Sequence, residues 1–273
     1  IGIAGLRGQV GIGMTVPRAM DFASALGTYI DSGTVVAACD TRISSCMFQN
    51  AVISSLLACG LDVIDAGVIS APEMHFAVRE LGASAGLLIG AGHHPKGWNA
   101  IMPLTSSGAF FTNIQLQELL DVYHSKRFGY RQWNQIGKDI PSPADIQDKY
   151  IDLLCSRLDV DLIASKRFTV VADFCNGSGV NVGEKFAKRL GINMIAINNE
   201  ASGILPHDPE PRPRSAVQAR SVLRPLKADI AFVFNSDMSR TSIVTDSGET
   251  LSEEYTIALV ADQVLSTKNR AQL

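Results

Sequence analysis

The chain has 273 residues, of which 46% are hydrophobic and 19% charged, and its formal net charge is −3. This composition excludes a disordered chain, and the absence of a basic excess argues against a nucleic-acid partner. No apolar run reaches the roughly 18 residues of a membrane-spanning helix, and no basic and apolar leader opens the sequence. We therefore expect a soluble, cytoplasmic protein of about two domains with no membrane partner.

Strand and helix patterns alternate through the first half of the chain. The predicted strands are 35–39, 63–66 and 85–89, followed by an edge hairpin of 101–104 and 109–111. The predicted helices are 15–30, 45–58, 72–81 and 114–123. Continuous apolar strands between helices are typical of a parallel sheet that is covered on both faces.

A second α/β unit follows a stretch that lacks regular apolar periodicity, residues 125–143, which we interpret as a connector between domains. Its predicted strands are 168–173, 192–197 and 229–234, and its predicted helices are 144–158, one ending near 190, 215–226 and 252–265. The expected fold class is α/β, with two tandem three-layer α/β/α domains and mostly parallel, mixed sheets. The domains are predicted to span residues 1–140 and 141–273.

The stretch from Ile89 to Asn99 is the first candidate site. Its three glycines, paired histidines and proline cannot continue the strand 85–89, so they predict a sharp, exposed loop at the carboxyl end of that strand. Ligands of open α/β sheets bind beyond the carboxyl ends of the strands, which makes this loop a place where chemistry is expected. An ordinary strand-to-helix turn is the alternative interpretation.

This loop resembles the active-site serine loop of the alpha-D-phosphohexomutases, the phosphoglucomutase and phosphomannomutase family. The family pattern is Thr-Ala-Ser-His-Asn-Pro, three variable residues, Asn-Gly, one variable residue and Lys. The residues that match it are Ala91, His93, Pro95 and Asn99. The position of the phosphorylated serine is Gly92, and the position of the terminal lysine is Met102. The resemblance places His93 among the catalytic residues and Asn99 at the substrate, and it leaves the chain without the family's nucleophile.

Three further segments carry the same resemblance. Gly2 to Gly8 is similar to the opening motif Phe-Gly-Thr-Ser-Gly-Ile-Arg-Gly, which puts Arg7 at the arginine that faces the active site. Asp40 to Ser45 matches Asp-Thr-Arg-x-Ser-Ser. A helix start beside Arg42 predicts a phosphate contact, with a plain helix cap and a solvated arginine as the alternative. Asn176 to Gly179 resembles Asp-x-x-Asn-Gly-x-Gly, and without a full G-x-G-x-x-G pattern no dinucleotide cofactor is expected.

The second candidate site follows the predicted strand 229–234. In the family this position holds Asp-x-Asp-x-Asp-Arg, whose alternating carboxylates bind a magnesium ion that also touches the phosphoserine, so the resemblance places both loops at one site. Alternate residues of an extended loop point the same way. Here the triad is Asn235, Asp237 and Ser239, followed by Arg240. The family implies Mg²⁺, but with two of three carboxylates replaced we expect weak Mg²⁺ binding or none. Arg240 is then expected to pair with Asp237 or with an anionic ligand.

The resemblance implies an isomerase that moves a phosphoryl group between a serine and either end of a hexose phosphate. Glycine has no atom that carries a phosphate, so we expect a retained scaffold and anion-binding surface without mutase activity. The residues of that surface are Arg7, Arg42, His93 and Arg240. The alternatives are phosphoryl transfer through His93 or His94 and a scaffold with no ligand. The expected partners are a hexose phosphate or similar anionic small molecule and the family's domains III and IV, which the resemblance does not cover.

Overall fold

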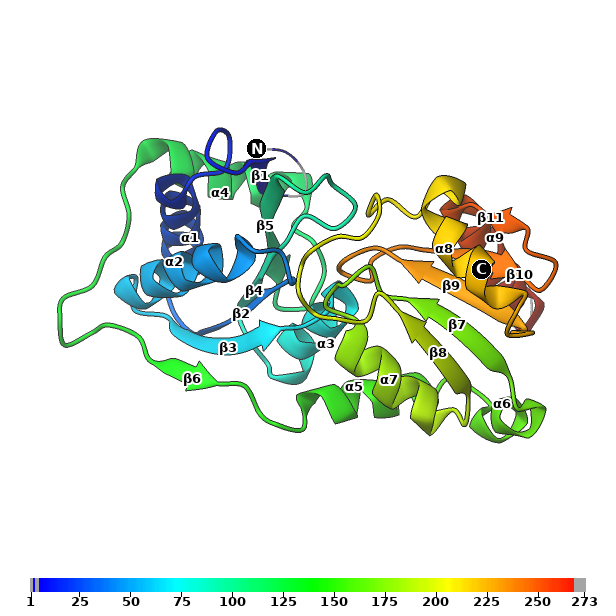
Figure 1. Cartoon of the computed structure of the whole chain (residues 1–273). Helices are drawn as coiled ribbons and strands as arrows, with labels where there is room; N and C mark the ends of the chain where they lie inside the picture. The colour runs from blue at the N-terminus through cyan, green and yellow to red at the C-terminus, as the bar shows by residue number, and fades with distance from the viewer. Residues whose placement is uncertain (1, 3–4, 268–273) are drawn as a thin grey trace.

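The computed structural model of the chain describes residue 2 and residues 5–267, and it contains two α/β units arranged in tandem (Figure 1). The first sheet contains β1 Leu6–Gln9, β2 Thr34–Cys39, β3 Asp62–Val68, β4 Ala85–Ile89, β5 Trp98–Thr105 and β6 Asp139–Pro141. Their order across the sheet is β1-β5-β4-β2-β3-β6. The strands β4, β2, β3 and β6 are parallel neighbours, whereas β5 is antiparallel to both β4 and β1. The sheet is therefore mixed.

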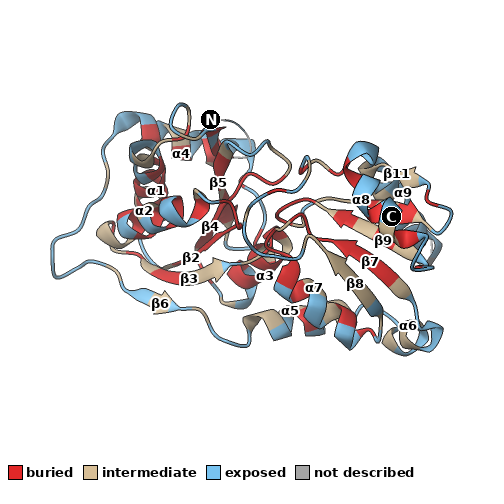
Figure 2. Cartoon of the chain, viewed as in Figure 1, coloured by how far each residue is buried: buried red, intermediate tan, exposed pale blue. Residues whose placement is uncertain are grey.

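Helices cover both faces of this sheet. On one face lie α1 Val16–Ile30, α2 Ser45–Ala58 and α4 Asn113–Ser125, whose apolar side chains, among them Phe22, Phe48 and Leu116, share one buried cluster with the strands. On the other face lies α3 Ala71–Glu80, which packs through Met74 and Val78. The central strands β2 and β4 lie buried between these layers, whereas the edge strand β6 is largely exposed (Figure 2). The first unit thus has the predicted three layers.

The second sheet has the order β11-β10-β9-β7-β8. Its strands are β7 Thr169–Asp173, β8 Asn193–Ile197, β9 Ile230–Phe234, β10 Thr241–Thr245 and β11 Thr250–Leu251. The helices of this unit are α5 Ile146–Cys155, α6 Val160–Lys166, α7 Val180–Arg189, α8 Val217–Leu223 and α9 Glu253–Thr267. Residues of α8 pack on one face of the sheet and Val180 of α7 packs on the other. Within the described residues no helix is both long and apolar enough to cross a membrane.

Several predicted elements differ from the structure at the sheet edges. The predicted hairpin is only partly formed. Its first arm lies within β5, and residues 109–111 contribute a single antiparallel bridge from Phe110 to Leu104 before the capping box at Thr112 starts α4. The connector contains a strand, β6, which pairs with the otherwise free edge of β3. The helix predicted over 144–158 is shorter, since α5 ends at Cys155, and a separate helix that was not predicted, α6, follows it. The strands β10 and β11 were not predicted.

The chain start is a strand and not a loop. Leu6 to Gln9 pairs in antiparallel register with β5, so that Arg7 lies opposite Ala100. Ile3 and Ala4 of the opening segment lie outside the described residues. This pairing fixes Arg7 next to the end of β4, where the glycine-rich loop begins.

Candidate functional site

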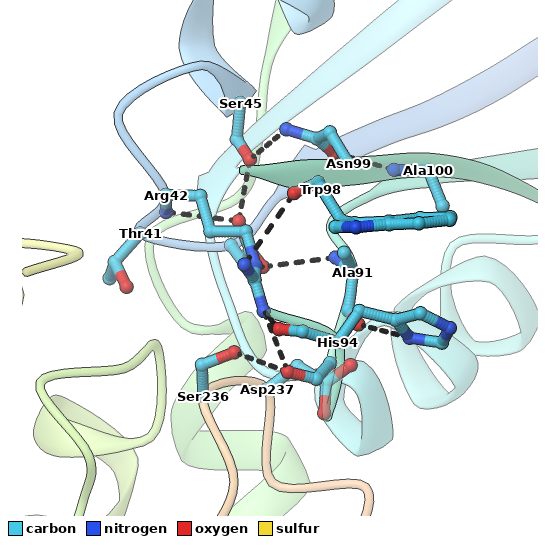
Figure 3. A network of polar contacts seen from close by, with 12 residues as sticks. Thr41, Arg42, Ser45, Ala91, His94, Trp98, Asn99, Ala100, Ser236 and Asp237 are labelled. Carbon is cyan, nitrogen blue, oxygen red and sulfur yellow. Dashed lines mark hydrogen bonds and ion pairs between the residues drawn. The ribbon is translucent and has the colours of Figure 1, made fainter. Parts of the chain in front are cut away.

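A buried aspartate organises the first loop cluster. Asp40 follows β2 and is 1% exposed. One carboxylate oxygen accepts hydrogen bonds from the Arg42 backbone N–H at 3.0 Å and the Ser45 hydroxyl at 2.5 Å. The other accepts from Arg42 Nε at 3.2 Å and the Ala91 N–H at 3.3 Å (Figure 3). A side chain at Gly90 would place its Cβ 2.7 Å from this carboxylate, so glycine is what allows β4 to end so close to it.

Arg42 holds the backbone of the glycine-rich loop. Its Nη2 donates to the carbonyls of Gly92 at 2.9 Å and His94 at 2.6 Å, and its Nη1 donates to the carbonyl of Pro95 at 3.0 Å. Arg42 is 5% exposed, and it is not one of the residues that line the adjacent cavity. We predicted a phosphate contact here. The structure instead directs this charge at loop carbonyls and at Asp40, a buried pairing in which each partner satisfies the other.

Asn99 also lies inside the protein. It is 0% exposed, and its Nδ2 donates to the hydroxyls of Ser44 at 2.8 Å and Ser45 at 2.9 Å. Its Oδ1 accepts from the Ala100 N–H at 2.8 Å. Asn99, which we predicted to contact the substrate, therefore links β5 to the start of α2. Its side-chain amide is used in these hydrogen bonds.

A cavity of about 450 Å³ lies where the first and second domains meet. Leu88, Met102 and Phe110 form part of an apolar wall. The charged and titratable side chains that line it include Arg7, His93, His94, Asp237 and Arg240. Of the nine residues predicted for the sites, Gly92, Ser239 and four of these five belong to the lining, whereas Arg42, Asn99 and Asn235 do not.

Gly92 lies directly against the second domain. Its φ of +50° is in the left-handed region, and a Cβ at this position would lie 2.8 Å from Asp237 Oδ2. The Gly92 carbonyl accepts hydrogen bonds from Ser236 Oγ at 3.0 Å and from Arg42 Nη2 at 2.9 Å. The two loops that resemblance assigned to one site are therefore in contact, and the position of the family's phosphoserine faces the position of the family's metal ligands.

The two histidines of the loop have adjacent rings, with centroids 4.3 Å apart. His94 Nδ1 lies 2.9 Å from the Ala91 carbonyl oxygen, which only accepts, so Nδ1 carries the proton and Nε2 keeps its lone pair. Burial lowers the pKa of both imidazoles, and the charge of Arg240 at His93 and of Arg7 at His94 acts in the same direction. Both side chains are consequently neutral near pH 7.

The two arginines at the cavity differ in their partners. Arg240 Nη1 lies 2.9 Å from Glu253 Oε1 and 3.9 Å from Glu210, so its charge is paired with carboxylates of the second domain and not with Asp237. Arg7 is exposed, and its side chain makes no hydrogen bond or ion pair within the described residues. Of the two arginines, Arg7 is therefore the one whose charge is free for a ligand.

The three positions of the metal triad do converge. Asn235 Nδ2 donates to Ser239 Oγ at 3.0 Å, and Ser239 Oγ donates to Asp237 Oδ1 at 2.6 Å. The part of the chain that the structure describes has no group of three or more His, Cys, Asp or Glu side chains arranged to hold a metal. One carboxylate among oxygens that already hydrogen-bond to each other does not fit a hard divalent cation.

Sequence reasoning missed a second buried aspartate. In the loop Pro206 to Pro211, His207 Nε2 lies 3.2 Å from Oδ2 of Asp173, which lies at the carboxyl end of a strand as Asp40 does and is 0% exposed. His207 Nδ1 lies 2.8 Å from the Asp208 carbonyl. Burial alone would lower the pKa of His207, but the hydrogen bond and charge of Asp173 outweigh it, so this pKa is raised.

The fold and the site define a class of protein, a tandem α/β chain with a cavity between loops at the carboxyl ends of strands, where proteins of this architecture bind ligands. A phosphomannomutase-family crystal structure from Thermus thermophilus has a TM-score of 0.85 at 23% identity, covering 96% of this chain and 61% of that chain. A phosphoglucomutase/phosphomannomutase family protein from Burkholderia thailandensis has a TM-score of 0.78 at 24% identity, covering 97% of this chain and 58% of that one. These likenesses establish the fold.

The sequence matches the family descriptions "Phosphoglucomutase/phosphomannomutase, alpha/beta/alpha domain I" over residues 1–129 and "alpha/beta/alpha domain II" over residues 148–248. The chain belongs to the phosphoglucomutase/phosphomannomutase family of alpha-D-phosphohexomutases. Mg²⁺-dependent mutases are what membership of this family implies for its enzymes.

Two curated relatives illustrate the range of names in the family. One, from Pyrococcus horikoshii, is named "Probable phosphoglucosamine mutase" and is 33% identical over 272 residues, which is 100% of this chain and 59% of the relative. The other, from Thermococcus kodakarensis, is named "Phosphoglucomutase/phosphomannomutase" and is 30% identical over 270 residues, 97% of this chain and 59% of the relative. The chain thus spans about three-fifths of the length of these relatives.

Proposed function

We propose that this chain binds a hexose phosphate, or a similar anionic small molecule, without carrying out the intramolecular phosphotransfer of its family. One observation carries the proposal. The position of the family's phosphoserine is Gly92, which offers no hydroxyl, and the Asp237 carboxylate lies 2.8 Å from the point where the Cβ of a side chain at this position would be. A negative charge at that point opposes a phosphoryl group, because like charges in a partly buried site repel strongly.

Retained anion binding is supported by the other end of the cavity. Arg7 has a free guanidinium fork there, a geometry that suits phosphate oxygens. The neutral histidines add ring nitrogens for hydroxyl groups. A volume of about 450 Å³ lies within the range of small-molecule sites. In this proposal the protein acts as a sugar-phosphate binder or regulatory partner.

The test combines calorimetric binding of glucose 1-phosphate with a phosphoryl-transfer assay that supplies glucose 1,6-bisphosphate and Mg²⁺. We expect saturable binding that Arg7→Ala weakens about tenfold or more, from the loss of a charged hydrogen bond, and no turnover. Arg127→Ala, an exposed arginine of the connector, is the matched control and should bind as the natural chain does. Turnover by the natural chain, or binding that Arg7→Ala leaves unchanged, would contradict the proposal.

A double change, Gly92→Ser with Met102→Lys, tests whether the missing groups alone silence the chemistry. The Asp237 carboxylate has to rotate to admit the serine, because the new Cβ would lie 2.8 Å from its Oδ2. Any gain of turnover in this variant would show that the scaffold still supports phosphoryl transfer.

A second candidate function, transfer through a histidine, is favoured by the tautomer of His94. Its unprotonated Nε2 could attack the phosphorus of a phosphate monoester, forming an N–P bond while the P–O bond to the sugar breaks and the sugar oxygen takes a proton. Incubation with glucose 1,6-bisphosphate would then leave an acid-labile phosphoramidate, visible by phosphorus NMR and absent from His94→Asn. An unlabelled natural chain would remove this candidate.

A further inference from the structure

The loop between β9 and β10 is closed by its own hydrogen bonds. Asn235 Oδ1 accepts from the Arg240 N–H at 3.1 Å, and Asn235 Nδ2 donates to Ser239 Oγ at 3.0 Å. Asp237 Oδ1 accepts twice from Ser239, from the hydroxyl at 2.6 Å and from the N–H at 3.0 Å. Each link lies within six consecutive residues and joins a donor to an acceptor.

These links depend on the residue types at the two changed positions. A carboxylate at position 235 or 239 would be acceptor-only, so the bonds from Nδ2 of Asn235 and from Oγ of Ser239 would be lost. Three ionised carboxylates would then face one another in a partly buried loop, and a cation would be needed to hold them together. Asn235 and Ser239 supply donors in place of that cation.

The spacing of the side-chain ends is nevertheless that of a metal site. Ser239 Oγ lies 2.6 Å from Asp237 Oδ1 and 3.0 Å from Asn235 Nδ2. Neighbouring oxygens around an octahedral Mg²⁺, at metal–oxygen distances of 2.0–2.1 Å, are about 2.9 Å apart. The loop therefore brings the side-chain ends of positions 235 and 237 within reach of position 239, and the negative charges of two carboxylates are what it lacks as a metal site.

We propose that Asn235 and Ser239 make the 235–240 loop independent of divalent cations, and that Asn235→Asp with Ser239→Asp is sufficient to make it a Mg²⁺ site. In the natural chain hydrogen bonds between donors and acceptors hold the loop together. In the double variant three carboxylates would take their place and would bind Mg²⁺. This inference does not depend on whether the cavity binds a phosphate ester.

The experiment measures the melting temperature of each protein in EDTA and in millimolar MgCl₂. The natural chain is expected to melt at the same temperature in both. The double variant is expected to melt several degrees lower than the natural chain in EDTA and to recover most of that loss as MgCl₂ is added, with a saturable dependence on its concentration. The inference would be overturned if the melting temperature of the natural chain rose saturably with MgCl₂, or if that of the double variant did not change with MgCl₂.

A matched control separates site binding from general charge screening. Asn193→Asp with Ser221→Asp adds the same two charges at exposed positions of the second domain, and it should show no saturable Mg²⁺ response. If the double variant is unfolded in EDTA, refolding on addition of MgCl₂ supports the inference. If it is unfolded in both, the single change Asn235→Asp decides: a melting temperature that rises with Mg²⁺ supports the inference, and one that does not overturns it.

Discussion

The two polar networks beside the cavity are held together in different ways. The Asp40 and Arg42 network joins residues about fifty positions apart through a buried charge pair, and its bonds end on the backbone of another loop. In the 235–240 network the side chains of Asn235, Asp237 and Ser239 bond to one another or to a neighbouring N–H, through amide, carboxylate and hydroxyl groups. The family's motif is intact in the first and changed in the second. We call the Asp40 and Arg42 network the clamp. Because it joins distant segments, few other residue types could replace its members, whereas a short loop can be held by its own hydrogen-bond donors in place of a cation.

Removing the clamp should produce the largest effect. Arg42→Ala deletes the donors to three loop carbonyls and leaves the Asp40 carboxylate buried without its partner. We expect the free energy of unfolding to fall by about 3–5 kcal/mol, the cost of an uncompensated buried charge, as measured by urea denaturation. The control is Arg7→Ala, an exposed arginine whose loss should cost less than about 0.5 kcal/mol. Equal costs for the two variants would show that the clamp is not structural.

Disturbing the contact between the two networks should lower the free energy of unfolding by an intermediate amount. Gly92→Ala forces a Cβ into a left-handed conformation and toward Asp237 Oδ2, so we expect a loss of about 1–3 kcal/mol in the same urea experiment. Gly97→Ala, in the same loop, has no heavy atom within 4 Å of the new Cβ and serves as the matched control. If both alanines cost the same, the fit of Gly92 against Asp237 has no energetic consequence.

The smallest effect should appear only as a dependence on pH. The pKa of His207 is raised in the folded chain above its unfolded value of about 6.5, because Asp173 stabilises the imidazolium. Its stabilisation is therefore fully present below about pH 6.5 and is lost as the pH rises through the folded pKa. Denaturation midpoints recorded from pH 5.5 to 8.5 should fall more in the natural chain than in His207→Gln. Parallel pH profiles of the two proteins would refute this linkage.

The sequence was sufficient to predict the bounds of those helices and strands that have strong local signals. The helix from Ser45 to Ala58 and the strand from Ala85 to Ile89 were predicted to the residue, since an apolar pattern and a clear end mark each. The short strands β6, β10 and β11 were missed, because strands of two to five residues with at most two strongly apolar side chains show no clear periodicity.

The position of the candidate site could be predicted from the sequence, but the directions in which its side chains point could not. Motif resemblance placed Gly92 and Asp237 in one site, and the structure brings them into contact. It also suggested that Arg42 faces a ligand, yet the direction of a long side chain depends on carbonyls that arrive from residues 92–95. The partnership of His207 with Asp173 joins residues 34 positions apart, and no spacing rule indicates it.

The carbonyl oxygen of Gly92 has two lone pairs, and each accepts a donor from a different domain, Arg42 from the first and Ser236 from the second. A single ¹³C label on this carbonyl would therefore act as a spectroscopic gauge of how the two domains meet. Separation of the domains would remove one donor and keep the other, so the stretching frequency of the labelled group would shift upward by a discrete step. The stretching frequency of this one carbonyl would then report whether the two domains are in contact, and neither a dye nor a second label would be needed.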